Sequence, residues 1–412
     1  MPSADCALYA ELLANIRQIS LAVTLPSPCD SSTRVAVSAD CQTVELRHRS
    51  STCTLRLPGK ASLGGVVLPI QNKQCGSTSL EWRLPLDAPS LPPANQADYT
   101  PWSATDLDTG SGVDCRQCAT NLVRPGSVKV WKDLPSENWA EMMEFWHCHK
   151  PDHHHHHQNH DGKTGKAGDE GLAARGYGAS SSISAQKGVG FVDLTTLLFD
   201  ETDCQPLTFS LSTYDQGTTD RLGLSLSTLS ANKIRSLNIF CTSCNAQLGF
   251  FNFRTSAVTL LKWQVSCKSA SGTAPSIPEC LAATLVSTIA RSGSSKSLIT
   301  PLDEPSREAD GKTGPVSALH IWVLNSSIVY SSSETPRRIP AIKLLYRILS
   351  LEEANKMLEA VTCDSQEINI PAQAIGGVIR HLEHSSGLLP SKERKFKEWN
   401  VGLLTRWEQK VW

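Results

Sequence analysis

The chain has 412 residues, 39 basic and 40 acidic side chains, a formal net charge of −1 and 40% hydrophobic residues. The balanced charge does not favour direct contact with nucleic acid or an anionic membrane, and no apolar run is long enough to predict a transmembrane helix. The start of the chain lacks the basic and apolar regions of a secretory leader, so we expect a cytoplasmic and nuclear protein. The 14 cysteines then favour metal binding and free thiols over disulfides.

The first hundred residues are predicted to be rich in β-strands. Residues 7–19 follow a short amphipathic pattern that predicts a helix. Residues 33–86 hold short alternating segments separated by turn residues, which is typical of a β-sandwich or a barrel-like sheet. The predicted strands read RVAVSAD, TVELRHR, STCTLRLPG, GGVVLPI and SLEWRLPL. Residues 87–101 are rich in proline and predict a linker or long loop.

Two similar phrases, far apart in the chain, point to a metal site. Each reads C-x-x-C-x-x-x-Leu, with Cys115 and Cys118 in the first and Cys241 and Cys244 in the second. A C-x-x-C turn directs two thiolates towards one point, and a tetrahedral Zn²⁺ ion takes four. The two phrases therefore predict one closed, structural Zn²⁺ site that holds residues 110–265 in one folded unit. The alternative is two unrelated cysteine pairs.

The segment after the first phrase predicts a helix with three metal-ligating residue types at its end. Asn138 and Glu141 have the spacing of a capping box. One face of the helix would carry Trp139, Met142, Met143 and Trp146. Its end would present His147, Cys148 and His149, which could bind a metal, contact a partner protein or form an ordinary loop.

Residues 150–188 form a low-complexity insert that includes a histidine tract at 153–157. Because the insert has almost no core-forming side chains, we expect a mobile loop. Further strands are predicted at 127–131, 189–200, 236–253 and 257–265. An aromatic cage for a small ligand or a peptide end is an alternative to core packing for Phe251, Phe253 and Trp263.

The last third of the chain mixes helices and strands. Helices are predicted at 277–291, at 350–361, where Ser350 and Glu353 form a capping box, and at 371–387, where Pro371 and Gly387 bracket the pattern. A β-hairpin is predicted at 317–332 and a strand at 341–349. The buried stripe of the last helix would consist of Ile375, Val378, Ile379 and Leu382.

Together these elements predict an α+β fold that is mainly β. We expect three regions: a β-rich, sandwich-like region at 1–100, a zinc-knuckle β domain at 101–265 with the insert at 150–188, and an α+β region at 266–412.

Cys363 is a further candidate nucleophile. It lies after a predicted helix and before a polar loop. Catalysis by a thiol needs an accessible thiolate, and the neighbouring Glu359, Asp364 and Glu367 disfavour one. An ordinary small side chain remains the alternative.

Several phrases resemble the family of HECT-like ubiquitin-conjugating-enzyme-binding proteins. The resemblance covers most of the chain except the insert. The phrases are Leu134-Pro-Ser-Glu-Asn-Trp139 with Trp146-His-Cys-His149, the Cys241 phrase, His320-Ile-Trp-Val-Leu-Asn325, Ala341-Ile-Lys-Leu-Leu-Tyr346 and the stretch from Leu389 to Leu404. Separately, the two cysteine phrases resemble the zinc-bound β-tent of Yippee-like and cereblon-like domains.

The resemblance implies a ubiquitin-protein ligase that binds a ubiquitin-loaded conjugating enzyme and promotes transfer of ubiquitin to substrate lysines. If a covalent relay exists, Cys363 is the first candidate nucleophile and Cys148 the second. The resemblance also implies further partners, namely the pre-mRNA 3′-end processing nuclease or a cyclin-like substrate. The alternative function is a non-enzymatic binding protein or assembly chaperone for that nuclease. Finally, the resemblance implies a partner-binding segment, which consists of Pro135, Ser136, Glu137, Asn138, Trp139, Trp146, His147, Cys148 and His149.

Overall fold

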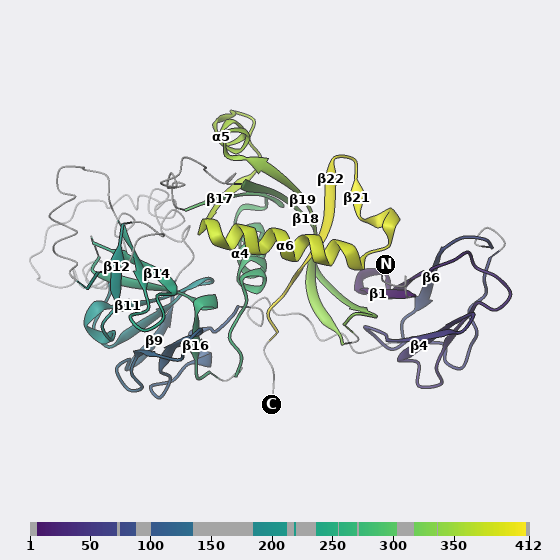
Figure 1. The fold of residues 1–412 in the computed structure, drawn as a ribbon, viewed down its shortest axis with the longest axis horizontal. Helices are drawn as coiled ribbons and strands as arrows, with labels where there is room; N and C mark the ends of the chain where they lie inside the picture. The colour runs from purple at the N-terminus through teal and green to yellow at the C-terminus, as the bar shows by residue number, and fades with distance from the viewer. Residues whose placement is uncertain are drawn as a thin grey trace, which may run out of the picture. The chain divides into compact units, whose positions relative to one another are not determined.

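The computed structural model describes residues 6–71, 75–87, 100–134, 184–211, 218–219, 236–253, 255–269, 272–302, 317–335 and 337–408. These residues form a mainly β fold with three α-helices, which confirms the predicted fold class (Figure 1). None of the helices among them combines the length and apolar character needed to cross a bilayer. Short 3₁₀ turns link several strands, at Ala14–Ile16, Ala104–Asp106, Glu201–Asp203, Lys262–Gln264 and Ser391–Glu393.

The chain forms two compact units. The first combines Met1–Pro101 with Ile277–Gln409, and the second contains Trp102–Ser276. The three regions expected from the sequence remain a prediction.

The first unit is built on a nine-stranded sheet. Seven strands follow the order β21 (Lys395–Phe396), β22 (Trp399–Thr405), β19 (Ile339–Ser350), β18 (Ser317–Ser332), β1 (Ala7–Leu13), β2 (Gln18–Thr24) and β6 (Ser79–Pro85). β17 (Lys296–Pro301) pairs with β18 and with β20 (Gln366–Ile370). The β1–β18 pairing, with Tyr9 opposite Ser332, joins the first and last parts of the chain.

Residues 7–19 are not the predicted helix. They form β1, a 3₁₀ turn and the start of β2, with Arg17 in the left-handed conformation at φ 52°. The prediction was wrong because a short apolar run fits a buried strand as well as a helix. β1 has strands on both sides and five consecutive buried residues, so sheet pairing overrides the local helix preference of its alanines and leucines.

The predicted hairpin at 317–332 is also wrong, because this segment is the single long strand β18. The polar residues in its middle form irregularities between Val323 and Ile328 rather than a chain reversal. The strand stays paired with β19 on both sides of these irregularities, so two long ladders replace the expected turn. The predicted strand GGVVLPI is reduced to an isolated bridge between Val67 and Ala36.

A small sheet packs beside this framework. It contains β3 (Arg34–Val37), β4 (Thr43–His48) and β5 (Ser51–Arg56), as the alternating sequence predicted. Its inward side chains share a core with those of β1 and β2, which explains the sandwich-like pattern. Core members include Val35, Val44, Leu46, Leu55, Leu8, Leu12, Ile19 and Leu21.

The three α-helices of the described residues belong to the first unit. α4 (Ile277–Ser292) and α6 (Ala372–Leu388) pack against β22, and α5 (Leu351–Glu359) packs against β18 and β19. Figure 1 shows α6 lying across the sheet strands. The capping box of Ser350 and Glu353 is present as predicted. The predicted stripe of α6 is confirmed at its buried positions Ile375, Val378 and Leu382, whereas Ile379 is half-buried.

The second unit contains two sheets. The larger follows the order β12 (Thr208–Ser210), β13 (Ser236–Phe240), β14 (Gln247–Asn252), β15 (Ala257–Leu261), β11 (Thr196–Asp200), β10 (Val189–Val192) and β9 (Val130–Asp133). The smaller contains β16 (Val265–Cys267), β7 (Val113–Cys115) and β8 (Asn121–Val123). The two cysteine phrases form the connections β7–β8 and β13–β14, one in each sheet.

Candidate functional site

The first cysteine phrase forms a tight turn between two short antiparallel strands. The Cys115 amide donates to the Thr120 carbonyl over 2.8 Å, and the Ala119 amide donates to the Cys115 carbonyl over 2.9 Å. Ala119 adopts a left-handed conformation with φ 59°. This turn brings the side chains of Cys115 and Cys118 to the same end of the strand pair.

The second phrase repeats this backbone arrangement. The Cys241 amide donates to the Ala246 carbonyl over 2.9 Å, and the Asn245 amide donates to the Cys241 carbonyl over 2.9 Å. Asn245 is left-handed with φ 56°. The leucine of each phrase, Leu122 or Leu248, is buried at 2% or 0% exposure. Each phrase is thus anchored in the core by its leucine while its cysteines form the tip.

The four cysteine sulfurs meet in the second unit. The ligand atoms of Cys115, Cys118, Cys241 and Cys244 all lie within 4.8 Å of one another. The Sγ atoms of Cys115 and Cys244 are 3.7 Å apart, and those of Cys118 and Cys241 are 3.6 Å apart. A tetrahedron with Zn–S bonds of about 2.3 Å has sulfur–sulfur edges of about 3.8 Å. The cluster therefore fits a single metal ion, with two ligands from each sheet.

The surroundings of three of the cysteine thiols shift their pKa values in different directions. Burial raises the pKa of Cys115 and raises that of Cys244 to about 12. The hydroxyl and the amide of Thr120 lower the pKa of Cys118 to about 6, and the Thr120 hydroxyl lies 3.2 Å from the Cys118 sulfur. The lowered pKa favours the thiolate of Cys118, whereas the raised pKa values of Cys115 and Cys244 mean that these two thiols need a cation to lose their protons.

A glycine lets the second turn sit close to the neighbouring strand. A Cβ atom on Gly249 would lie 1.9 Å from the Thr259 carbonyl oxygen, which is backbone that cannot rotate away. The pairing of β13 with β14 is irregular between Ile239 and Phe240, beside the same turn. The pair Leu248-Gly249 therefore has a packing role. Leu248 anchors the phrase in the core, and Gly249 lets the backbone lie close to Thr259.

The predicted partner-binding segment lies outside the described residues. This applies to Pro135, Ser136, Glu137, Asn138, Trp139, Trp146, His147, Cys148 and His149. The predictions for a capped helix, a second metal and a nucleophilic Cys148 therefore remain predictions.

Cys363 lies between α5 and β20, in the first unit. The residue is half-buried, and its thiol contacts the Ser365 carbonyl over 3.6 Å. Two of the neighbouring carboxylates noted in the sequence have other partners. Asp364 pairs with Lys296, and Glu367 accepts a hydrogen bond from the Thr300 hydroxyl over 3.1 Å. No other hydrogen-bond partner reaches the Cys363 sulfur within the described ranges.

A buried imidazole near this loop was not singled out from the sequence. His320 on β18 is 6% exposed, and its Nε2 atom lies 3.2 Å from the Ser365 hydroxyl. Its ring packs on Trp399 at a centroid distance of 4.7 Å. Burial lowers the pKa of His320, and the cations Arg347 and Lys296 lower it further. The lowered pKa favours a neutral ring at physiological pH. In the sequence, the feature that could have pointed to this histidine was its place in the phrase His320-Ile-Trp.

The alternative of an aromatic cage has no support in the geometry. Phe251 is fully buried and meets Phe209 and Phe253 edge to face at 5.6 and 5.5 Å. Trp263 is 7% exposed. The three phenylalanine rings pack with one another, and Trp263 is buried, which favours core packing.

Comparison with known proteins identifies relatives. Residues 11–401 match the model of a family described as HECT-like Ubiquitin-conjugating enzyme (E2)-binding. The uncharacterized protein YJR141W of Saccharomyces cerevisiae is 22% identical over 302 residues, which cover 73% of this chain and 71% of that protein. The uncharacterized protein C1734.10c of Schizosaccharomyces pombe is 42% identical over 66 residues, 15% of this chain and 19% of that protein. No solved structure matches the chain.

Proposed function

Because the chain belongs to the family of HECT-like ubiquitin-conjugating enzyme (E2)-binding proteins, we propose that it is a ubiquitin-protein ligase. It binds a ubiquitin-loaded conjugating enzyme and promotes transfer of ubiquitin to substrate lysines. The observation that carries the proposal is the extent of the family match, which begins in β1 and ends in β22. The match therefore spans both units, and membership supports a ubiquitin-conjugating enzyme as the partner.

The metal in this proposal is a structural Zn²⁺ ion held by Cys115, Cys118, Cys241 and Cys244. Four thiolates complete its tetrahedral shell and leave no position for water or substrate. The ion would thus join the two sheets of the second unit without taking part in the transfer reaction. Metal content measured by native mass spectrometry tests this assignment, with residues 153–157 deleted so that the histidine tract binds no metal. One zinc per chain is the expected result, and a metal-free, fully folded chain would refute it.

In the form of the proposal that the contacts of Cys363 support, the chain brings the two reactants together and forms no covalent bond with ubiquitin. A bound conjugating enzyme holds its thioester beside a substrate lysine, and the amine attacks the thioester carbonyl while the enzyme's cysteine thiolate leaves. Well-oriented groups of this kind reach effective molarities of about 10⁵ M or more. The contacts of Cys363 support this form, because its thiol faces a backbone carbonyl and touches no general base among the described residues.

A covalent relay is the second form of the same proposal. Cys363 thiolate would attack the thioester, release the conjugating enzyme's thiolate and carry ubiquitin until a lysine amine displaces it. Cys148 is the second candidate for this step. A relay gives a ubiquitin adduct that reducing agents cleave and that disappears when the responsible cysteine is replaced by alanine.

The test is lysine discharge from a panel of ubiquitin-loaded conjugating enzymes. We expect the full chain to bind at least one of them and to accelerate discharge in a saturable way. Cys363→Ala and Cys148→Ala are compared with Cys75→Ala, which removes an exposed thiol outside either candidate site. Direct transfer predicts full activity in all three variants and no reducible adduct. A chain that neither binds any member of the panel nor changes its discharge rate would contradict the proposed function.

A further inference from the structure

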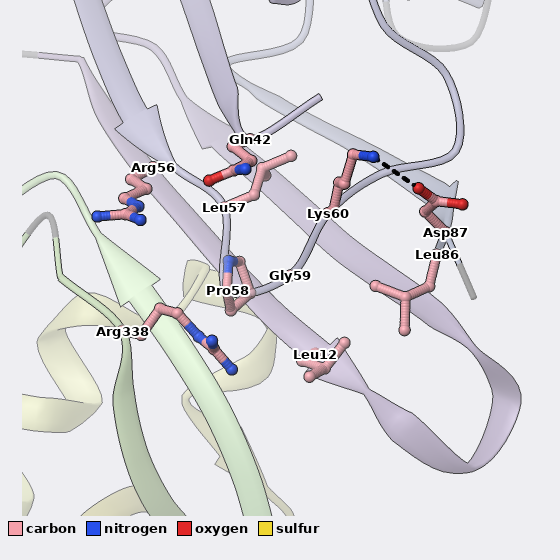
Figure 2. Close-up of a pocket in the computed structure, with 10 residues that line it drawn as sticks. All are labelled: Leu12, Gln42, Arg56, Leu57, Pro58, Gly59, Lys60, Leu86, Asp87 and Arg338. Atoms are coloured by element: carbon pink, nitrogen blue, oxygen red, sulfur yellow. Dashed lines mark ion pairs between the residues drawn. The ribbon is translucent and has the colours of Figure 1, made fainter. Parts of the chain in front are cut away.

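A cavity of about 250 Å³ lies in the first unit, and its lining includes no residue of the four-cysteine cluster or of the Cys363 loop. Segments distant in sequence form it: β1, the turn before β4, the end of β5 with the loop that follows, the residues after β6 and the residue before β19. Figure 2 shows the loop Leu57–Lys60 beside Arg56 and Arg338, whose guanidinium groups point in different directions.

The charged groups of the cavity leave an excess of positive charge. Its acidic lining residue, Asp87, is paired with Lys60 over 2.9 Å. The two arginines in the lining, Arg56 and Arg338, have no carboxylate within ion-pair distance in the described part of the chain. Both are exposed, so their guanidinium groups can reach a ligand without being pulled out of a core.

Apart from Gln42, the other residues that line the cavity are apolar. Leu57, Pro58 and Leu12 are buried, and Leu86 is half-buried. A Cβ atom on Gly59 would lie 2.7 Å from the Leu86 Cδ1 atom, so the loop approaches this leucine as closely as a glycine allows. The cavity thus joins a fixed apolar floor to two cationic side chains.

The size of the cavity limits what it can hold. Pockets for drug-sized molecules and cofactors span about 300–1,000 Å³, and this one is smaller. It has room for one or two side chains. Guanidinium groups prefer carboxylates and phosphates, which they bind with paired hydrogen bonds, while the floor favours an aliphatic neighbour of the anion.

We propose that this cavity binds an acidic peptide segment of a partner protein, with one carboxylate on Arg56, another on Arg338 and an aliphatic side chain between them on the leucine and proline floor. The inference does not depend on the proposed ligase function, because the cavity contains no residue of the metal centre or of the Cys363 loop. It adds a peptide-docking site to the side of the first unit that carries the N-terminal strands.

The test uses a fluorescent peptide of alternating glutamate and leucine, titrated with the full chain and followed by anisotropy. We expect saturable binding that weakens about tenfold in Arg56→Ala and in Arg338→Ala, because a charge-assisted hydrogen bond contributes on the order of one tenfold step or more. The matched control is Arg337→Ala, which removes an exposed neighbouring arginine that does not line the cavity. Arg338→Lys keeps the charge and should retain part of the affinity.

Three results would overturn the assignment. The first is no saturable binding of the acidic peptide. The second is equal loss of affinity in Arg337→Ala, or equal binding of a peptide with glutamine in place of glutamate, since either would show binding unrelated to this cavity. The third is arginine-dependent binding of inorganic phosphate with no peptide binding, which would identify a simple anion site. Thermal unfolding of each variant checks that its fold is intact, as the exposure of the three arginines leads us to expect.

Discussion

Replacing Cys118 by serine tests the metal centre directly, because this cysteine is exposed and its loss leaves no cavity. An ordinary exposed residue changes the free energy of unfolding by less than about 0.5 kcal/mol when substituted. A structural Zn²⁺ ion contributes about 10–16 kcal/mol in zinc-finger peptides, so one of four ligands carries roughly 3 kcal/mol. We therefore expect Cys118→Ser to destabilise the second unit by at least about 3 kcal/mol, whereas the same change at an unliganded surface site would leave the free energy of unfolding nearly unchanged.

The matched control is Cys75→Ser, which changes an exposed free cysteine of the first unit. Metal content is measured by native mass spectrometry on chains lacking residues 153–157, and stability by hydrogen exchange of the amides in the second unit. Cys118→Ser should lose the metal and the exchange protection of β7, β8, β13 and β14, while Cys75→Ser should keep both. If Cys118→Ser retains one zinc and full protection, the four-thiolate argument is wrong.

Three further predictions concern the framework. Gly249→Ala should weaken exchange protection of β14 and β15 by at least about 1–3 kcal/mol, because the new Cβ meets the Thr259 carbonyl at 1.9 Å; wild-type protection would contradict this. Lys343→Met should lower the unfolding free energy by about 3–5 kcal/mol, because Glu11, whose side chain is only 6% exposed, loses its ion pair. The exposed pair of Lys356 should contribute under about 1 kcal/mol in the same thermal melts, and equal losses would count against burial as the cause. Burial lowers the pKa of Lys343, but Glu11 and a second carboxylate raise it by more, so its folded-state pKa is raised. Its stabilising effect is thus complete below the unfolded pKa of about 10.4 and lost as pH rises through the folded value, so the gap between wild type and Lys343→Met should shrink in strong alkali.

The four-cysteine cluster could be predicted from the sequence because each cysteine turn depends on local residues. The spacing of Cys115 and Cys118 determines one turn, and the same spacing at Cys241 and Cys244 determines another. The sequence also showed that the turns were alike, down to the leucine that anchors each one. That two pairs this far apart belong together was a hypothesis from coordination chemistry, and the sulfur distances support it.

Residues whose role depends on distant partners were harder to identify. His320 and Ser365 meet only because β20 pairs with β17, which in turn pairs with β18. The two arginines of the cavity lie at the ends of different strands, and no pattern around Arg56 or Arg338 relates them. Such sites carry no spacing signal, because the intervening chain can have any length.

The sequence by itself determined the short-range features: the two cysteine turns, the capping box of Ser350 and Glu353, and the extent of α6. Each depends on side chains and backbone groups within one or two turns of chain, so the local order of residues is sufficient. Only the tertiary structure decided that residues 7–13 form a strand and that 317–332 continue as one strand rather than a hairpin. Those outcomes depend on the pairing of β1 with β18, because its hydrogen bonds and the apolar surface that it buries outweigh the local conformational preferences of either segment.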